Sequence, residues 1–282
     1  MIYDKLIQTD ELLPRLGDTN WLIFDCRFDL ADTTKGERLY HQSHIPGAIY
    51  AHLDRHLSSP VTPASGRHPL PQQVELVEWL AACGLRPDTQ VVVYDDCFGA
   101  MASRLWWLLQ CLGHRAVALL DGGWQAWQDQ SLAQDARLPL LSPSSFNAVF
   151  DLQYMVDTDA VVDNLQSKQF QLIDVRSAER FSGKLEPIDP VAGHIPGALN
   201  RPLSDNLDAR GFFKPVQQLQ DYYAPIQADW ASQQQVFMCG SGVTACHSVL
   251  ATMIAGYPMP RLYTGSWSEW ICDDARAVET SL

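Results

Sequence analysis

The sequence predicts an α/β protein made of two copies of one fold, each a parallel sheet flanked by helices. Two observations indicate this. Short runs that are apolar throughout alternate with helical stretches, as is typical of strands buried on both faces of a parallel sheet. The segment His44–Ala48, His-Ile-Pro-Gly-Ala, returns letter for letter as His194–Ala198, about half the chain length further on.

Three more landmarks recur in the same order at a similar offset. They are Phe24–Arg27 with Ile173–Arg176, Val91–Asp95 with Val236–Cys239, and Asp121–Trp127 with Thr264–Trp270. Such ordered recurrence indicates duplication. We therefore expect two domains of equal fold, over residues 1–140 and 151–282. Prolines and serines cluster between them, over Leu138–Asp151, as in a linker.

The strands and helices follow from the apolar runs. In the first half we expect strands at Trp21–Asp25, Val91–Asp95 and Ala116–Leu120. In the second half we expect them at Gln171–Val175, Gln235–Cys239 and Arg261–Thr264. Helices are expected at Met101–Leu112 and Val243–Ala255. Active sites of such sheets lie beyond the carboxyl ends of the strands.

Composition narrows the classes of function. The chain has 282 residues and a formal net charge of −13, which disfavours nucleic acid or an anionic membrane as the main partner. The amino-terminal residues lack the pattern of a signal peptide, and no apolar run approaches the length of a membrane span. The seven cysteines include no Cys-x-x-Cys pair, which suits a reducing cytoplasm and disfavours a disulfide framework or a structural zinc site. We expect a cytoplasmic protein without a metal ion.

Cys239 is the strongest candidate for chemistry. The apolar run Val236–Met238 predicts the end of a buried strand, Gly240 and Gly242 bracket a serine, and a helical pattern follows. Backbone N–H groups converge at such a strand-to-helix turn and stabilise an anion, and the thiolate is the reactive form of cysteine. A buried structural cysteine beside a glycine turn fits this local pattern equally well.

The equivalent loop of the first half looks inactive. Asp95 or a neighbour stands where Cys239 stands in the second half, and Cys97 follows two residues later. Asp95 and Asp96 oppose a negative charge on that thiol. We expect the first domain to keep the scaffold without the chemistry, and a second active thiol at Cys97 is the less favoured alternative.

Together these features resemble the tandem rhodanese-fold sulfurtransferases, from about Leu12 to Trp270. That family shows the duplication, both His-Ile-Pro-Gly-Ala blocks and a Gly-Ser-Trp-x-Glu-Trp segment near the carboxyl end. The loop Cys239–His247 is similar to that of the 3-mercaptopyruvate subfamily, whereas thiosulfate enzymes carry basic residues at the places of Gly240 and Ser241. The resemblance implies a persulfide on Cys239, release of pyruvate, and transfer to cyanide or a thiol acceptor such as a thioredoxin-like protein, with no cofactor.

The resemblance also implies acid–base residues. Ser241 of the loop, with His68 and Asp54 from the first half, would form a proton relay. A neutral loop suits a donor whose single carboxylate lies away from the reacting sulfur. Without the resemblance, Ser241 is a helix-capping residue and His68 a surface histidine.

Substrate binding is implied for Arg180, whose planar guanidinium matches a carboxylate, and for the loop residues Gly240, Gly242, Val243 and Thr244. Without the resemblance, an exposed arginine on a helix face is the favoured interpretation of Arg180.

Many members of the subfamily have a second arginine in the Glu-Pro segment that follows. Here Ile188 stands near that place, and Arg201 is the candidate substitute.

Other conspicuous residues are expected to be structural. His44 and His194 occur in identical blocks of an active and an inactive half, which favours a role in the fold. Cys246 lies two turns after Cys239 on the buried helix face. Trp267 and Trp270 are expected to pack in the final helix.

Three rival functions remain. A thiosulfate:cyanide sulfurtransferase would use the same nucleophile and is separated by a comparison of donors. A cysteine-dependent phosphatase needs an arginine where this chain has Ala245. A non-catalytic binding or sulfur-relay module is disfavoured because Cys239 is present.

Overall fold

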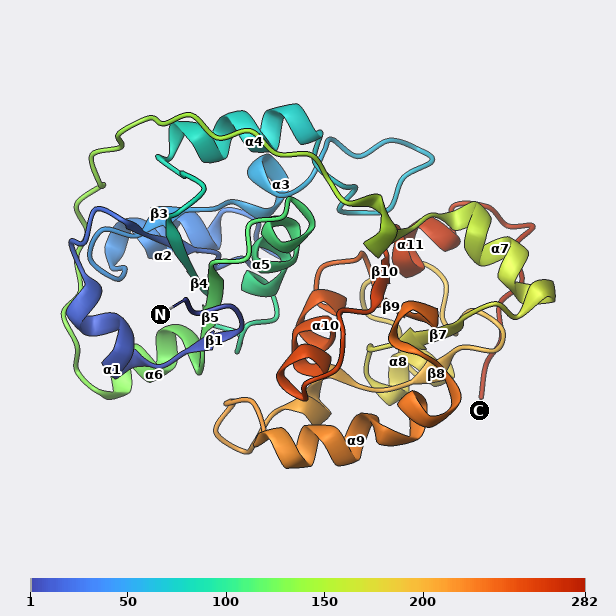
Figure 1. Ribbon diagram of the computed structural model, residues 1–282. Helices are drawn as coiled ribbons and strands as arrows, with labels where there is room; N and C mark the ends of the chain where they lie inside the picture. The colour runs from blue at the N-terminus through green and yellow to red at the C-terminus, as the bar shows by residue number, and fades with distance from the viewer. Residues whose placement is uncertain (1, 282) are drawn as a thin grey trace. The chain divides into compact units, whose positions relative to one another are not determined.

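A computed structural model describes residues 2–281 of the chain and divides it into two compact units (Figure 1). The first comprises the residues up to Ser59 together with Leu70–Asp151, and the second comprises Pro60–Pro69 together with the residues from Leu152 onward. The segment Pro60–Pro69 thus belongs to the second unit, although it lies within the first half of the sequence.

The first unit contains a five-stranded sheet in which every pairing is parallel, in the order β1-β5-β4-β2-β3. The strands are β1 (Leu6–Ile7), β2 (Trp21–Asp25), β3 (Ile49–Tyr50), β4 (Gln90–Tyr94) and β5 (Val117–Leu120). The helices are α1 (Thr9–Leu12), α2 (Lys35–Gln42), α3 (Leu53–His56), α4 (Gln73–Ala82), α5 (Ala102–Cys111) and α6 (Gly123–Asp129), with a 3₁₀ turn at Leu13–Arg15.

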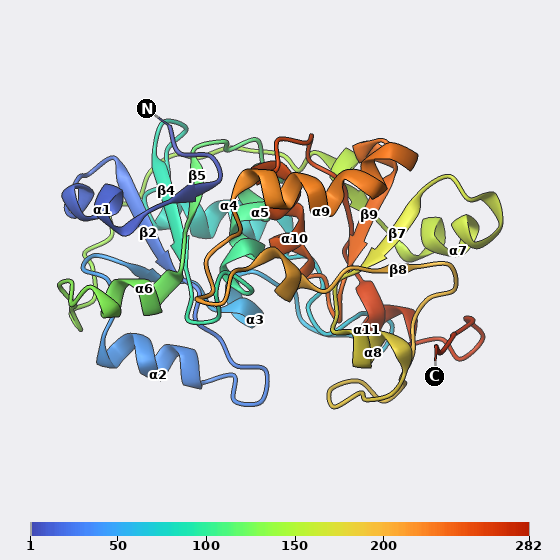
Figure 2. The same ribbon diagram turned by 90° about the horizontal axis from the view of Figure 1, so that it is seen from below.

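The second unit repeats this topology in the order β6-β10-β9-β7-β8, again with parallel pairings throughout. Figure 2 shows its strands β9, β7 and β8. Its strands are β6 (Met155–Val156), β7 (Gln171–Asp174), β8 (Leu199–Asn200), β9 (Gln235–Met238) and β10 (Arg261–Tyr263). Its helices are α7 (Thr158–Ser167), α8 (Ala178–Ser182), α9 (Val216–Asp229), α10 (Ala245–Ile254) and α11 (Ser266–Trp270), with 3₁₀ turns at Leu152–Tyr154, Leu203–Asn206 and Ser232–Gln234.

The predicted fold class is confirmed. All six expected strands are present with ends within one residue of the prediction, and the two expected helices correspond to α5 and α10. The sequence analysis missed the four two-residue edge strands β1, β3, β6 and β8, because two residues carry no readable alternation.

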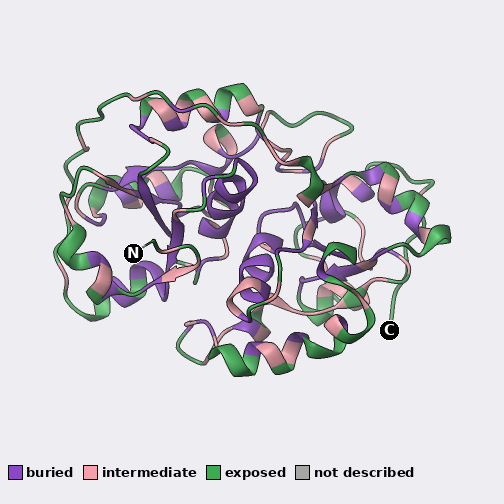
Figure 3. Ribbon diagram, in the orientation of Figure 1, coloured by how far each residue is buried: buried purple, intermediate pink, exposed green. Residues whose placement is uncertain are grey.

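Helices cover both faces of each sheet. In the second unit, the tryptophans of α11 and Val161 of α7 pack with the strand residues Val236 and Met238. Tyr223 of α9 lies against Phe237, whose side chain points to the other face, and α10 also packs there. Helix α10 is buried over most of its length, as Figure 3 shows. The helix that follows Cys239 is therefore fixed in the core.

Each repeated Asp-x-Arg segment forms a buried ion pair. Arg27 pairs with Asp25 at 2.6 Å, and Arg176 pairs with Asp174 at 2.6 Å. Each guanidinium also donates to a backbone carbonyl and lies over a tryptophan ring. Burial of such a pair requires its polar atoms to be satisfied, which explains why the segment recurs intact.

The two repeated histidines are structural, as predicted. His44 Nδ1 lies 2.7 Å from the carbonyl oxygen of Tyr40, and His194 Nδ1 lies 2.8 Å from that of Phe181. Each imidazole stacks on the ring of the same residue whose carbonyl it contacts. Trp267 and Trp270 are fully buried in α11, as expected.

Within residues 2–281, no helix combines the length and the apolar character that a membrane span needs.

Candidate active site

The strand register identifies the residue of the first unit that is equivalent to Cys239. Tyr94 is the last residue of β4 and pairs with Asp25, while Met238 is the last residue of β9 and pairs with Asp174. The next residues, Asp95 and Cys239, therefore occupy the same place at the carboxyl end of the central strand. Their carbonyl oxygens also accept equivalent bonds, from the N–H groups of the first tryptophan of α6 and of α11.

In the first unit this place holds an anion. The Asp95 carboxylate accepts hydrogen bonds from four backbone N–H groups of the loop that follows β4. They belong to Cys97, Gly99, Met101 and Ala102, at 2.8 to 2.9 Å. The loop that follows β4 is thus an anion-binding cradle of convergent N–H groups at a helix start.

In the second unit the residue at the equivalent place is a cysteine. Cys239 is only 1% exposed, and its own N–H donates to Ser266 Oγ at 3.1 Å. The loop leads directly into α10, which begins at Ala245. The backbone N–H groups of Gly240, Ser241, Val243, Thr244 and Ala245 make no hydrogen bond to any residue within the described range 2–281. These donors are therefore unpaired, among the described residues, in the loop that corresponds to the one binding the Asp95 carboxylate.

Gly242 gives the loop its shape. It has φ +74°, and a Cβ there would lie 2.2 Å from the carbonyl oxygen of Thr264. Both the left-handed backbone and the close approach exclude a side chain. This glycine is therefore required for the turn, and its contribution to substrate binding stays a prediction.

Ser241 and His68 are in contact. His68 Nδ1 lies 2.7 Å from Ser241 Oγ, and each residue is 5% exposed. Both belong to the second unit, because His68 lies in the segment Pro60–Pro69. The contact predicted for these two side chains is present, and their role in proton transfer is taken up below.

Asp54, the third expected member of the relay, lies in α3 of the first unit. Its backbone N–H donates to His52 Nδ1 at 3.1 Å, and the N–H of His52 donates to His56 Nδ1 at 3.0 Å. The two histidines therefore fix the short helix that carries Asp54. The contribution of Asp54 to the relay stays a prediction.

Arg180 lies beside the loop, as the resemblance implied. A Cβ at residue 240 would lie 3.5 Å and 3.7 Å from Arg180 Nη2 and Nη1. The Arg180 Nε donates to both carboxylate oxygens of Glu186 at 3.0 Å, and Nη2 donates to Asp189 Oδ2 at 3.0 Å. Helix α8, capped by Ser177, presents this side chain.

Arg67 is a residue near the nucleophile that the sequence analysis did not single out. Its Nη2 would lie 2.7 Å from a Cβ at residue 240, and its Nη1 donates to Asp189 Oδ1. The pKa of Arg67 is lowered, chiefly by burial and also by the neighbouring Arg180, whereas a negative charge on Cys239 would raise it. Two cations thus flank Gly240, although the loop itself is neutral.

Arg201, the expected substitute for the second arginine, lies elsewhere in the second unit. Its guanidinium lies over the ring of Tyr222, with the guanidinium carbon 5.3 Å from the ring centroid. Ile188 is 43% exposed, so the place of the missing arginine faces solvent. A clamp role for Arg201 stays a prediction, and the structure offers Arg67 closer to the loop.

The remaining cysteines differ from Cys239 in their surroundings. Burial and the charges of Asp95 and Asp96 raise the pKa of Cys97 well above its usual range. Cys246 is fully buried, as predicted, and its thiol lies 3.4 Å from the carbonyl oxygen of Gly242. All seven cysteines are free. Among residues 2–281, no three histidine, cysteine or acidic side chains gather in a group that could hold a metal ion.

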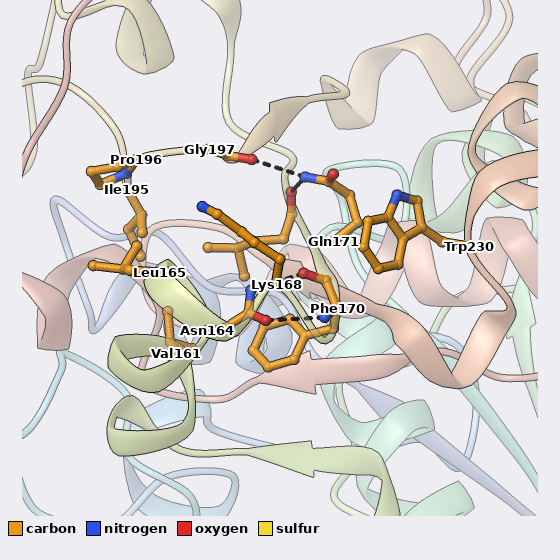
Figure 4. A pocket seen from close by; sticks show the side chains of 11 residues that line it. Val161, Asn164, Leu165, Lys168, Phe170, Gln171, Ile195, Pro196, Gly197 and Trp230 are labelled. Carbon is orange, nitrogen blue, oxygen red and sulfur yellow. Dashed lines mark hydrogen bonds between the residues drawn. The ribbon is translucent and has the colours of Figure 1, made fainter.

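A small pocket of the second unit lies at the other end of the strands (Figure 4). It is lined by Gln171, the first residue of β7, and by Lys168, Gly197 and Trp230. The Gln171 amide donates to the carbonyl oxygen of Gly197 at 2.9 Å. Because Cys239 follows the opposite, carboxyl end of the parallel sheet, this pocket is separate from the candidate active site.

The comparison with protein families agrees with the duplication. The family model described as rhodanese-like domain matches residues 8–130 and again residues 157–272. The chain belongs to the rhodanese family. The two matched ranges correspond to the two repeats of the sequence, and the resemblance inferred from the motifs is confirmed.

Relatives with this rhodanese fold are enzymes of sulfur transfer. A probable 3-mercaptopyruvate sulfurtransferase of Pseudomonas aeruginosa is 46% identical over 278 residues, which cover 98% of each chain. The thiosulfate sulfurtransferase of Mus musculus is 34% identical, over 96% of this chain and 93% of its own. The structure of 3-mercaptopyruvate sulfurtransferase from Leishmania major superposes with a TM-score of 0.82 at 33% identity, over 95% of this chain and 74% of that one. The chain is a sulfurtransferase.

Proposed function

We propose that this rhodanese transfers sulfur from 3-mercaptopyruvate, through a persulfide on Cys239, to a small thiol, a thioredoxin-like protein or cyanide. One observation carries the proposal. Cys239 occupies the register position at which the first unit binds a carboxylate with four backbone N–H groups. The equivalent donors of the second unit would stabilise a thiolate there.

In the first step the Cys239 thiolate attacks the sulfur of mercaptopyruvate. A sulfur–sulfur bond forms, the carbon–sulfur bond breaks, and its electron pair passes to the carbon skeleton as the enolate of pyruvate. The proton of the donor thiol moves to the enolate oxygen, which leaves the persulfide as an anion. The 2.7 Å contact between Ser241 Oγ and His68 Nδ1 supports a relay of this proton by these two side chains, with Asp54 as the expected third member. The enol then converts to pyruvate.

In the second step an acceptor thiol attacks the outer sulfur of the persulfide. The sulfur–sulfur bond to Cys239 breaks, the acceptor leaves as its own persulfide, and the Cys239 thiolate is restored. Cyanide accepts the same sulfur as thiocyanate. Two half-reactions on one nucleophile predict ping-pong kinetics. The scheme uses no metal ion and no organic cofactor.

Thiosulfate is the second candidate donor. It is a compact dianion that cationic side chains stabilise, and the guanidiniums of Arg67 and Arg180 both flank Gly240. The neutrality of Gly240 and Ser241 alone therefore does not exclude this donor. Two nearby carboxylates, Glu186 and Asp189, balance the two guanidiniums, which favours the singly charged mercaptopyruvate.

We further propose that the first domain is catalytically inactive and that the protein works in a reducing compartment such as the cytoplasm. In the first unit the Asp95 carboxylate fills the cradle, and the raised pKa of Cys97 keeps that thiol protonated. The seven free cysteines support a reducing environment.

Steady-state rates with the two donors, measured side by side on the purified protein, test the proposed function. We expect the higher kcat/KM with mercaptopyruvate, no transfer by Cys239→Ser, and near-normal transfer by the control Cys97→Ser. A higher kcat/KM with thiosulfate would reject the proposed donor. Absence of turnover with both donors would favour a sulfur-relay or binding module.

A further inference from the structure

We propose that Arg67 is the second arginine that binds the donor carboxylate, and that Asp189 is the positioning residue that holds Arg67 beside Arg180. The inference deepens the proposed function and rests on it. It assigns a substrate-binding role to a side chain from the segment Pro60–Pro69, which the sequence places in the first half of the chain.

Each of the two arginines keeps a guanidinium nitrogen that has no hydrogen-bond acceptor in the described part of the chain. Arg180 uses Nε and Nη2 on carboxylates, and Arg67 uses Nη1. Arg67 Nη2 and Arg180 Nη1 make no hydrogen bond within the described part of the chain, and both flank Gly240, the neighbour of Cys239. One nitrogen from each arginine is therefore available to an anion next to the nucleophile.

The hydrogen-bonding capacity of the Arg67 guanidinium is only partly used. Its Nε is buried and has no acceptor among residues 2–281. Buried guanidinium N–H groups are costly when unpaired, and a bound carboxylate would offset part of that cost by taking charge-assisted bonds. Arg67 also lies close enough to Cys239 for a negative charge on that sulfur to raise the pKa of the guanidinium.

Asp189 explains how two like charges stay side by side. Its side chain is 3% exposed, and its two oxygens accept from different arginines, Oδ1 from Arg67 Nη1 and Oδ2 from Arg180 Nη2. The bridge neutralises the repulsion between the guanidiniums and leaves their other nitrogens toward Gly240.

Glu186 holds Asp189 in turn. One Glu186 oxygen, Oε1, accepts the backbone N–H groups of Ile188 and Asp189, each at 3.1 Å. The Glu-Pro segment, in which a second arginine was expected, therefore supplies the carboxylate of Asp189. This carboxylate binds the guanidinium of Arg67, which comes from Pro60–Pro69.

The same segment serves both halves of the chemistry. The Arg67 backbone N–H donates to Ser268 Oγ at 3.0 Å, which fixes this segment against α11. The next residue, His68, contacts Ser241. In this proposal Arg67 binds the donor carboxylate and its neighbour His68 belongs to the proton relay. Two contacts hold the segment that carries them, one to Ser268 and one to Ser241.

The test uses the full-length protein and two readouts. The variants are Arg67→Met, Asp189→Asn and their combination, and the matched controls are Arg210→Met and Asp208→Asn, an exposed pair of the same unit. One readout is KM and kcat with mercaptopyruvate. The other is the concentration of pyruvate that protects Cys239 from iodoacetamide by half.

We expect Arg67→Met to raise KM and the half-protecting pyruvate concentration by about tenfold to a hundredfold, the range for one charge-assisted hydrogen bond. Because the carboxylate is bound in both ground and transition states, kcat should change by less than about threefold. Asp189→Asn should raise KM in the same way, and the double variant should match Arg67→Met, since Asp189 acts through Arg67.

Several results would overturn the inference. Arg67→Met with unchanged KM and unchanged protection would remove Arg67 from the clamp. Asp189→Asn with a lower KM would mean that Asp189 competes with the donor, and additive effects in the double variant would mean that it acts independently of Arg67. If wild-type protein shows no turnover of mercaptopyruvate but pyruvate protects Cys239 in an Arg67-dependent way, the proposed donor is wrong and the clamp stands.

Discussion

Replacing Ser241 with alanine separates proton transfer from sulfur transfer. The change removes the hydroxyl that lies 2.7 Å from His68 Nδ1 in a buried setting. A hydrogen bond of this kind contributes about 0.5–1.5 kcal/mol to stability, so the variant should stay folded. A positioned acid–base group contributes about 10²–10⁴-fold to rate, and we expect kcat with mercaptopyruvate to fall by about 10²-fold or more.

The assay compares two donors on the same variant. Attack on thiosulfate releases sulfite, which leaves with the electron pair and needs no proton, so Ser241→Ala should keep most of its rate with thiosulfate. The exposed Ser167→Ala on α7 is the matched control, and urea unfolding reports stability. An equal fall with both donors would mean that Ser241 shapes the loop, and no fall with mercaptopyruvate would refute the relay.

Three further outcomes are expected. Gly242→Ala should abolish sulfur transfer and lower the free energy of unfolding by at least about 1–2 kcal/mol, because the left-handed backbone and the close carbonyl of Thr264 exclude a Cβ. Normal activity of this variant would show that the turn is not required. Iodoacetamide at pH 8 should label Cys239 and spare Cys97, because burial and two carboxylates raise the pKa of Cys97. Peptide mass spectrometry reads the labelling, and rapid labelling of Cys97 would contradict this prediction. The first unit should lose stability as pH falls from 6.5 toward 4, by up to about 1.4 kcal/mol per pH unit for each proton taken up.

The sign of the last effect follows from His52 and His56. Burial lowers the pKa of both imidazoles, that of His56 to about 4, and each Nδ1 accepts a backbone N–H in the fold. The unfolded chain binds more protons in this window, so stability is full above the unfolded pKa and is lost on acidification. Thermal melts across the window, with His56→Gln to reduce the slope, are the measurement; a flat profile would contradict the geometry.

The sequence predicts the central strands well because they are long apolar runs. Their ends were predicted within a residue, and the strand register bears out the alignment of Asp95 with Cys239 that the repeat suggested. The edge strands were missed because each is two residues long and its pairing depends on the neighbouring strand. These edge strands form only where the assembled sheet offers a neighbouring strand to pair with.

The candidate site was predictable where its residues belong to one local pattern. Cys239 and its glycines lie in a strand–turn–helix segment, and the contact between Ser241 and His68 followed from the family resemblance. Arg67 was missed because no local pattern shows that Pro60–Pro69 joins the second unit. Its only signal was an arginine directly before the expected histidine.

The neutrality of the loop does not determine the charge of the site. Gly240 and Ser241 carry no charge, yet guanidiniums from two distant segments lie beside them. The charge at a site is the sum over every segment that packs there, and such long-range contacts are not visible in a single sequence.

The most direct test of the account is the location of the transferred sulfur. Purified protein is mixed with mercaptopyruvate in the absence of an acceptor, the free thiols are blocked, and the peptides are analysed by mass spectrometry. We predict one additional sulfur atom, carried by the peptide that contains Cys239 and absent from Cys239→Ser. Additional sulfur on the peptide that contains Cys97, or none on Cys239 while pyruvate is formed, would contradict the central claim.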